Sequence, residues 1–260
     1  MAAPISEAAL DARDWPHRGT PPLRLALIGG FNLTYRGEPV RLTPASQRLL
    51  ALLALHVRPL LRTFVAGTLW SDVSDERAAA SLRTTLWRLG RTGHRLVEAT
   101  SHALRMGPDL VVDYRRSLKA GRALVDDEDE GGDAREAAAA AWQGLLDDLL
   151  PTWGEEWVAI ERERFHQLRL DALETLSQRL TREGRHPEAL QVGLAAAAAE
   201  PLRESAQRTL IRVHLAQGNV GSAVHRYRAY RDLLKDELGV DPSRQIEALI
   251  GEIPAARDQV

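Results

Sequence analysis

The chain contains no cysteine, only two lysines and few aromatic residues. Without cysteine it forms neither disulfides nor thiolate metal sites, and it has no cysteine nucleophile, which agrees with a reducing cytoplasm. No apolar run approaches the ~20 residues that a membrane span needs. Its 260 residues, 44% hydrophobic and 27% charged, are typical of a soluble protein and long enough for two domains.

The two ends of the chain are expected to lie outside these domains. Residues 1–22 contain Asp11, Asp14 and Trp15 and lack the apolar centre of a signal peptide, so we interpret them as a flexible leader. Residues 253–260 are interpreted as a short tail. These features favour a cytoplasmic protein with no membrane partner.

The net charge of -2 hides a strong asymmetry along the chain. Residues 77–107 hold six arginines and one acid, Glu98, whereas residues 113–260 hold 20 basic and 27 acidic residues. A basic segment on an acidic body is typical of a protein that meets nucleic acid at one end only. A solvated arginine-rich helix is the alternative, since arginine replaces lysine almost everywhere in this chain.

The pattern over residues 23–112 predicts strands, then helices, then a hairpin. Alternating apolar residues indicate three short strands within 23–42, the last of them at 39–42 after a turn at 36–38. A short hairpin is expected at 95–106. Between them, three helices are expected, the first capped by Thr43 or Ser46 and ending near His56, the others at about 63–70 and 76–91.

Residues 113–252 are expected to be helical almost throughout. The acidic run 126–133 cannot pack and is interpreted as a loop. Glycine and proline mark the other breaks, and helices are expected at about 134–149, 155–182, 187–199, 202–216, 220–237 and 242–251.

An internal repeat of 34 residues runs through this helical region. Its matched pairs are Ala172 and Ala206, Leu176 and Leu210, Gly184 and Gly218, and Ala189 and Ala223. This is the period of tetratricopeptide (TPR) repeats, in which small residues let paired helices approach closely. The repeat therefore favours TPR-like helix pairs over the alternative, an ordinary antiparallel bundle.

Signals for catalysis are weak, so the sequence favours a protein that is not an enzyme and needs no cofactor or metal. The pair Gly29-Gly30 lies within a strand pattern and lacks a phosphate-binding motif, so a bulge is its expected use. The eight histidines show no metal-ligand spacing.

The helix expected at 76–91 is the best candidate for chemistry. Its apolar positions Ala79, Leu82, Leu86 and Leu89 fall on one face, which we expect to be buried. Arginines and short hydroxyls on the other face suit a reader of the DNA major groove. Trp87 is expected to pack on the hairpin or the first helix, with contact to the DNA backbone as the alternative. The predicted DNA-binding residues are Arg77, Ser81, Arg83, Thr84, Thr85, Arg88 and Arg91 on the helix, and Arg95, His102 and Arg105 on the hairpin.

Two long stretches resemble the SARP family, the Streptomyces antibiotic regulatory proteins. A winged helix of the OmpR/PhoB type occurs in that family, and it is resembled here by the stretch VAGTLWSDVSDERAAASLRTTLWRLGR together with its flanking strand patterns. The bacterial transcriptional activator domain that follows the winged helix in that family is resembled by two further stretches, EPLRESAQRTLIRVHLAQGN and ELGVDPS. The family pattern often has a basic residue where this chain has Gly90, and the acidic run 126–133 is an insertion.

The resemblance implies a mainly α fold with a small β component. A winged-helix DNA-binding domain at 23–112 would precede an all-α, TPR-like activator domain at 113–252. It also implies a transcription activator that binds direct repeats in promoter DNA, commonly as a homodimer, and recruits RNA polymerase through its sigma factor. Two alternatives stay open: a TPR-like protein-binding scaffold, and a regulator whose concave helical face senses a small ligand.

Overall fold

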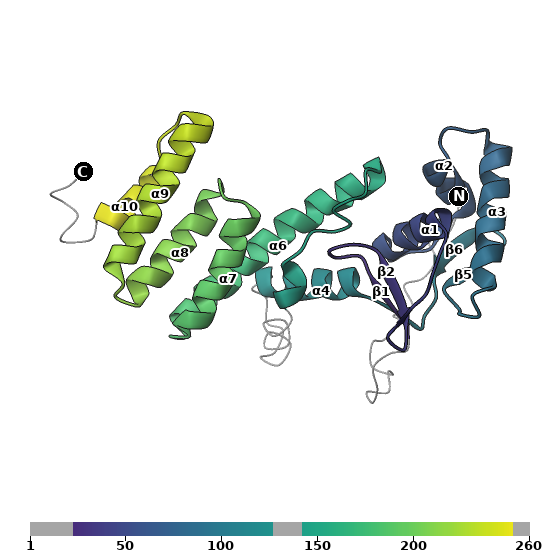
Figure 1. The fold of residues 1–260 in the computed structure, drawn as a ribbon, viewed down its shortest axis with the longest axis horizontal. Coiled ribbons are helices and arrows are strands. Elements are labelled where there is room, and N and C mark those ends of the chain that lie inside the picture. Colours follow the sequence, from purple (N-terminus) through teal and green to yellow (C-terminus); the bar gives the residue numbers. More distant parts are fainter. Residues whose placement is uncertain (1–22, 127–141, 252–260) are drawn as a thin grey trace, which may run out of the picture.

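The computed structural model describes residues 23–126 and 142–251. The expected leader, the expected tail and all but the first residue of the expected acidic loop lie outside these residues. The molecule is elongated, with a small α/β unit at one end and stacked helices that continue to the other (Figure 1). A mainly α fold with a small N-terminal β component is thereby confirmed.

The first sheet forms as the alternation of apolar residues predicts. Its strands run in the order β3-β2-β1-β7, and β1 is antiparallel to β2 but parallel to β7. Arg36 and Gly37 both have positive φ and form the turn between β2 and β3. The third strand lies earlier than expected, because β3 ends at Pro39, where the expected strand begins. The strand bounds are β1 Leu23–Ala26, β2 Asn32–Tyr35, β3 Glu38–Pro39 and β7 Leu110–Val112.

Three helices follow this sheet in the chain: α1 Pro44–Leu55, α2 Arg62–Leu69 and α3 Asp75–Gly90. The hydroxyl of Thr43 accepts a hydrogen bond of 3.3 Å from the backbone N–H of Ser46, so Thr43 is the cap of α1. Every residue from Leu49 to Leu55 is buried, which makes α1 the central element of this unit. α3 packs against both α1 and α2.

The expected hairpin is part of a second, three-stranded sheet. β5, Val97–Ala99, pairs with β6, Ala103–Met106, and β6 also pairs with β4, Leu60–Leu61. The backbone N–H of Arg62 donates a hydrogen bond of 2.9 Å to the carbonyl of His102. The hairpin is therefore held against the start of α2 as well as alongside α1.

The rest of the described chain is helical, with one departure from expectation. Residues 134–141 of the helix expected at 134–149 lie outside the described residues. In the remainder of that range, residues 142–145 form a short 3-10 helix, η1, and the chain is irregular from 146 to 155. None of the described helices is long and apolar enough to span a membrane. The helix bounds are α4 Asp113–Val125, η1 Trp142–Leu145, α6 Glu156–Arg182, α7 His186–Ala199, α8 Glu204–Ala216, α9 Val220–Leu238 and α10 Arg244–Gly251.

The 34-residue repeat corresponds to two pairs of packed helices, α6 with α7 and α8 with α9. Gly184 and Gly218 end the first helix of each pair with φ of 75° and 74°. In both copies the residue after the glycine donates its N–H to a carbonyl five positions back, at 2.9 Å. All six repeated alanines and leucines are buried. TPR-like pairing is therefore the packing that the structure shows.

The two units are joined by polar contacts to backbone. The carboxylate of Asp113, at the start of α4, accepts hydrogen bonds from the N–H groups of Leu27 at 2.9 Å and Ile28 at 3.2 Å. The guanidinium of Arg115 donates to three carbonyls at the end of α1. Both side chains bond to backbone across the boundary expected at 112, so the units are coupled.

Residues 147–157 add further contacts to this junction, just beyond the end of β1. Leu149 forms a bridge with Ile28, the N–H of Gly29 donates to the carbonyl of Asp148 at 2.8 Å, and the rings of Phe31 and Trp153 stack at 6.0 Å. One hydrophobic core therefore runs from the first sheet through α6 to α8. Gly29 and Gly30, which both have positive φ, turn the chain where this segment meets β1.

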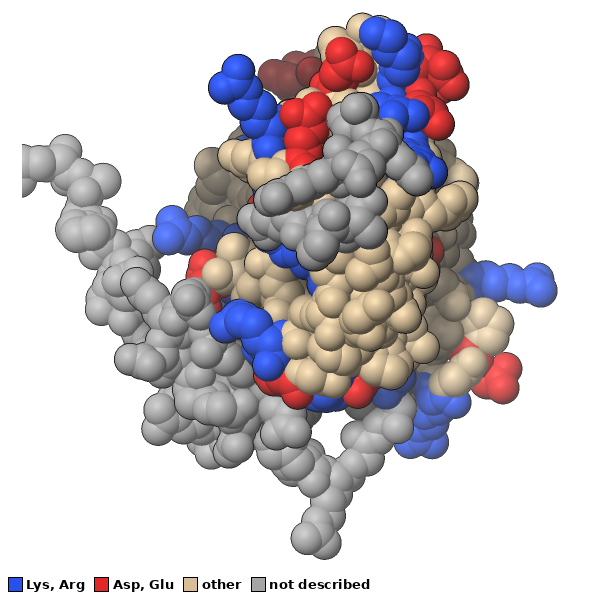
Figure 2. Space-filling view, turned by 90° about the vertical axis from the view of Figure 1, so that its left-hand side faces the viewer, with Lys and Arg blue, Asp and Glu red and all other residues tan. Residues whose placement is uncertain are grey.

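A second, smaller core lies at the far end of the helical unit, between α8, α9 and α10. Seen from that end, the middle of the surface is largely uncharged, and Lys, Arg, Asp and Glu side chains lie mostly around its margin (Figure 2). The basic residues singled out by the sequence lie at the opposite end of the molecule, on α3 and the β5–β6 hairpin (Figure 1).

Candidate nucleic-acid interface

The buried face of α3 differs in phase from the expected one. Its buried residues are Ala78, Leu82, Thr85 and Leu89. Leu86 is only partly buried, and Ala79 is likewise intermediate. The sequence ranks leucine above threonine for burial, but packing against α1 and α2 selects the face that carries Thr85.

Thr85 was wrongly placed among the DNA-binding residues. It is 4% exposed, and its hydroxyl donates a hydrogen bond of 2.8 Å to the carbonyl of Ser81. A threonine can enter a core in this way because the backbone satisfies its only polar group while its methyl packs. Its neighbour Thr84 is exposed, and the hydroxyl of Thr84 donates to the carbonyl of Ala80 at 3.0 Å.

The other predicted residues of α3 lie on its solvent-facing side. Arg77, Arg83, Arg88 and Arg91 are exposed, and Ser81 is half-buried at the edge of that side. Within the described residues, Arg77, Arg83 and Arg88 form no ion pair with an acidic side chain. Their charges are therefore available to an external anion.

Trp87 projects outward, against the expectation that it packs. The side chain is 60% exposed, and the guanidinium carbon of Arg91 lies 4.9 Å from its ring centroid. At about 100° per residue, Trp87 points about 170° away from the middle of the buried face. Trp87 therefore occupies the centre of the outer surface of α3, with Ala80 two turns before it. The helical periodicity of the sequence places Trp87 and Ala80 on this outer surface once Thr85, and not Leu86, is taken as the buried residue.

The hairpin presents its basic residues differently from the helix. Arg95 and Arg105 both contact the carboxylate of Glu98, at 2.9 Å and 2.6 Å, while more than half of each arginine side chain is exposed. His102 is exposed near the tip. One carboxylate thus partly neutralises two arginines of the hairpin, and the unpaired charge of the surface is concentrated on α3.

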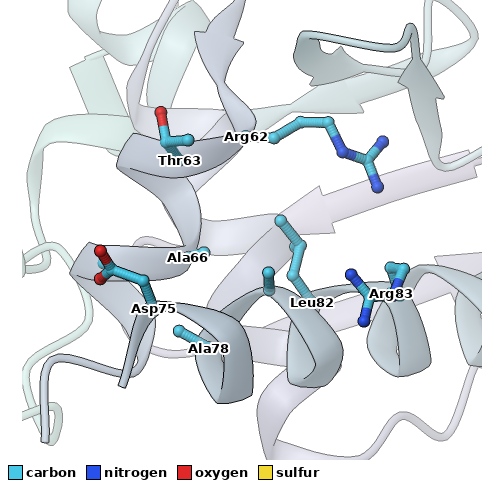
Figure 3. A pocket seen from close by; sticks show the side chains of 9 residues that line it. Arg62, Thr63, Ala66, Asp75, Ala78, Leu82 and Arg83 are labelled. Atoms are coloured by element: carbon cyan, nitrogen blue, oxygen red, sulfur yellow. The ribbon is translucent and has the colours of Figure 1, made fainter. Parts of the chain in front are cut away.

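A cavity of about 290 Å³ lies between α2 and α3. Its apolar lining includes Ala66, Ala78 and Leu82, with Arg62 and Arg83 on one side and Asp75 on the other (Figure 3). The Arg62 guanidinium also donates to the carbonyl of Thr100 at 3.2 Å, so it bridges α2 and the hairpin. The sequence analysis did not include Arg62 among the DNA-binding residues. The feature that could have identified it is a basic side chain at the first position of α2, facing α3.

The surface formed by α3 and the hairpin is suited to binding a polyanion. Its helix has exposed arginines without an acidic partner among the described residues and an exposed aromatic ring at its centre, and the hairpin adds further arginines. Arginine and short hydroxyls can bond to phosphates and to base edges. Within the described residues, no cluster of His, Asp or Glu could hold a metal ion.

Comparison with known proteins places residues 111–254 in one family. They match the family model described as the bacterial transcriptional activator domain. This match covers more than half of the chain and extends from β7 to just beyond α10. The expected resemblance to SARP regulators is thereby confirmed for the helical unit.

Two curated relatives carry the same name. The regulatory protein AfsR of Streptomyces coelicolor is 29% identical over 239 residues, which are 87% of this chain and 24% of that protein. Regulatory protein AfsR of Streptomyces griseus is 27% identical over 259 residues, which are 92% of this chain and 25% of that protein. The chain thus spans about a quarter of the length of these relatives.

One solved structure shares the fold over most of the chain. Mycobacterium tuberculosis EmbR, solved in complex with a low-affinity phosphopeptide, superposes with a TM-score of 0.67 at 22% sequence identity. The match covers 88% of this chain and 64% of that one. It therefore extends over both the α/β unit and helices of the second unit.

Proposed function

We propose that this chain, which belongs to the bacterial transcriptional activator domain family, is a transcription regulator that binds promoter DNA sequence-specifically and activates transcription. We assign DNA binding to a winged-helix domain at 23–112 and activation to a TPR-like domain at 113–252. The proposal rests on the outer face of α3, where Arg77, Arg83 and Arg88 have no acidic partner among the described residues. The family is regulatory rather than enzymatic.

The proposed interface places α3 in the major groove and the β5–β6 hairpin over the adjacent backbone. Three or four base-reading side chains at the centre and phosphate-binding arginines around them are the usual composition of such an interface. Arg83 and Arg88 flank the centre of α3, so each can reach a guanine or a phosphate. Arg62 joins them, because its guanidinium lies on the same side of the cavity as that of Arg83.

The partners follow from the same proposal. Two copies would bind neighbouring direct repeats, and the helical domain would recruit RNA polymerase through its sigma factor. Binding to chromosomal DNA would place the protein in the bacterial cytoplasm, without a membrane partner.

The test is selection of bound duplexes from a random pool, followed by anisotropy titrations of the selected duplex and of a scrambled one at several salt concentrations. We expect affinity for both to fall steeply with salt, because arginine–phosphate contacts release counterions. Arg83→Ala and Arg88→Ala should each weaken specific binding by about 1–3 kcal/mol if they contact bases. Arg212→Ala, on the exposed side of α8, is the control of equal charge.

The neighbouring threonines supply a matched pair for the same titration. Thr84→Ala should weaken specific binding, whereas Thr85→Val should leave it unchanged, because Thr85 is buried. Equal losses on specific and scrambled duplexes in the arginine variants would mean that these residues touch phosphate alone. Absence of any enriched sequence would favour a TPR-like scaffold or a ligand sensor instead.

A further inference from the structure

The outer surface of α3 has an apolar ridge at its centre. Ala80, Thr84 and Trp87 follow one another along the side of the helix that points away from the buried face, and all three are exposed. Arg83 lies to one side of this ridge, and Arg77 and Arg88 lie to the other, at about 100° per residue. The largest apolar side chain exposed on α3 is therefore the indole of Trp87, and arginines lie on both sides of it.

The indole of Trp87 is held in position by its own helix. Arg91 is four residues further along the chain, at the C-terminal cap of α3, and its guanidinium lies over the ring at 4.9 Å. This cation–π contact covers one face of the indole. The covered face cannot stack on a base, so the ring edge and the opposite face are the surfaces that a ligand can meet.

We propose that Trp87 is a specificity-determining residue, which recognises thymine through apolar contact between its indole and the 5-methyl group in the major groove. This inference rests on the proposed function. The thymine methyl is the one apolar group that base edges present in the major groove, and apolar side chains read it. The arginines on both sides of the ridge would meet the negative charge of the groove walls, which favours DNA over an apolar protein surface as the ligand of this face.

The experiment removes the methyl group from the DNA and the ring from the protein. The probe is the duplex that the full chain selects from a random pool, made again with each thymine in turn replaced by deoxyuridine. The wild-type protein should lose about fourfold in affinity at one or two positions, which is the worth of burying one methyl group. Trp87→Ala should show no loss at those positions and keep its other base preferences, because the two changes remove the same contact.

Control variants separate this contact from general effects. Ile160→Ala removes another exposed apolar side chain, from α6, and it should retain the wild-type response to deoxyuridine. Melting curves of Trp87→Ala should match the wild type, because the ring is exposed.

Two results would overturn the inference while leaving DNA binding intact. One is an identical response of Trp87→Ala and wild type to deoxyuridine. The other is unchanged DNA affinity of Trp87→Ala together with lost activation in a reporter strain, which would make Trp87 a protein-docking residue. If the wild-type chain enriches no sequence, the proposed function itself fails.

Discussion

The guanidinium of Arg115 on α4 donates a hydrogen bond of 2.8 Å from Nε to the backbone carbonyl of Ala54 at the end of α1. Its Nη2 reaches the carbonyls of Leu53 and His56 as well. α1 has no basic residue in its own last turn, so a side chain from the helical unit satisfies carbonyls that the helix leaves free. Burial lowers the pKa of Arg115, but an arginine stays charged at any physiological pH.

Replacing Arg115 by methionine should therefore destabilise both units together. The change keeps most of the apolar stem but leaves the carbonyls at the end of α1 without a donor. We therefore expect the free energy of unfolding to fall by about 3 kcal/mol. Urea unfolding followed by circular dichroism measures this loss. Arg116→Met is the matched control, because Arg116 is the next residue of α4 and is exposed. Equal effects of the two substitutions would show that the cap contributes nothing specific.

Glu98 sets the charge of the β5–β6 hairpin, since it contacts both Arg95 and Arg105. Glu98→Gln should tighten binding to DNA a few-fold and make it more dependent on salt. Each arginine that newly neutralises a phosphate changes the salt slope by about one. Anisotropy titrations at several salt concentrations measure both effects. Asp236→Asn on α9 makes the same charge change far from the hairpin. An equal gain in DNA affinity in this variant would mean that the net charge of the protein, and not Glu98 itself, explains the effect.

Ala223 tests the helix pairing that the 34-residue repeat predicts. It is fully buried between α8 and α9, so Ala223→Leu should overpack the pair and cost about 1–3 kcal/mol of stability. Ala229→Leu, on the exposed side of the same helix, should cost little. DNA binding should survive Ala223→Leu while activation in a reporter strain falls. Melting curves that do not distinguish the two variants would contradict tight pairing.

His214 should make the helical unit sensitive to acid. Burial, together with the nearby charge of Arg226, lowers the pKa of His214 below its ordinary value of 6.5. As the pH falls below 6.5, His214 becomes protonated in the unfolded chain while it stays neutral in the folded chain. The free energy of unfolding therefore decreases. His214→Gln should lose less stability than the wild type between pH 7 and pH 5. His225→Gln, on an exposed site of α9, should behave as the wild type does.

The sequence predicts the bounds of a helix well where the helix has a capping residue at its start or a glycine at its end. Thr43, one of the two expected caps, caps α1, and Gly184 and Gly218 end helices at the predicted places. Two strands escaped prediction, β4 and β7, which have two and three residues. So few residues show no alternation, and these strands form only because β6 and β1 lie beside them.

The phase of α3 could not be read from the sequence either. Leu86 and Thr85 are neighbours, and hydrophobicity alone assigns burial to the leucine. The structure buries Thr85 because this face of α3 packs against α1 and α2, and the hydroxyl of Thr85 is satisfied there by the carbonyl of Ser81 at 2.8 Å. That small rotation moves Trp87 from an expected packing position to the centre of the outer surface.

Residues 147–157 follow α4 in the chain but contact the connection between β1 and β2, with Trp153 stacked on Phe31 and Leu150 bonded to the backbone of Leu27. A chimera that joins the N-terminal half to a foreign effector at residue 112 would leave Phe31 uncovered and the carbonyl of Leu27 without its donor. It would also discard Arg115, the cap of α1. A graft that carries the donor sequence through Trp157 keeps all three contacts. The transplantable module of this chain is therefore longer than residues 23–112, the stretch for which we propose DNA binding.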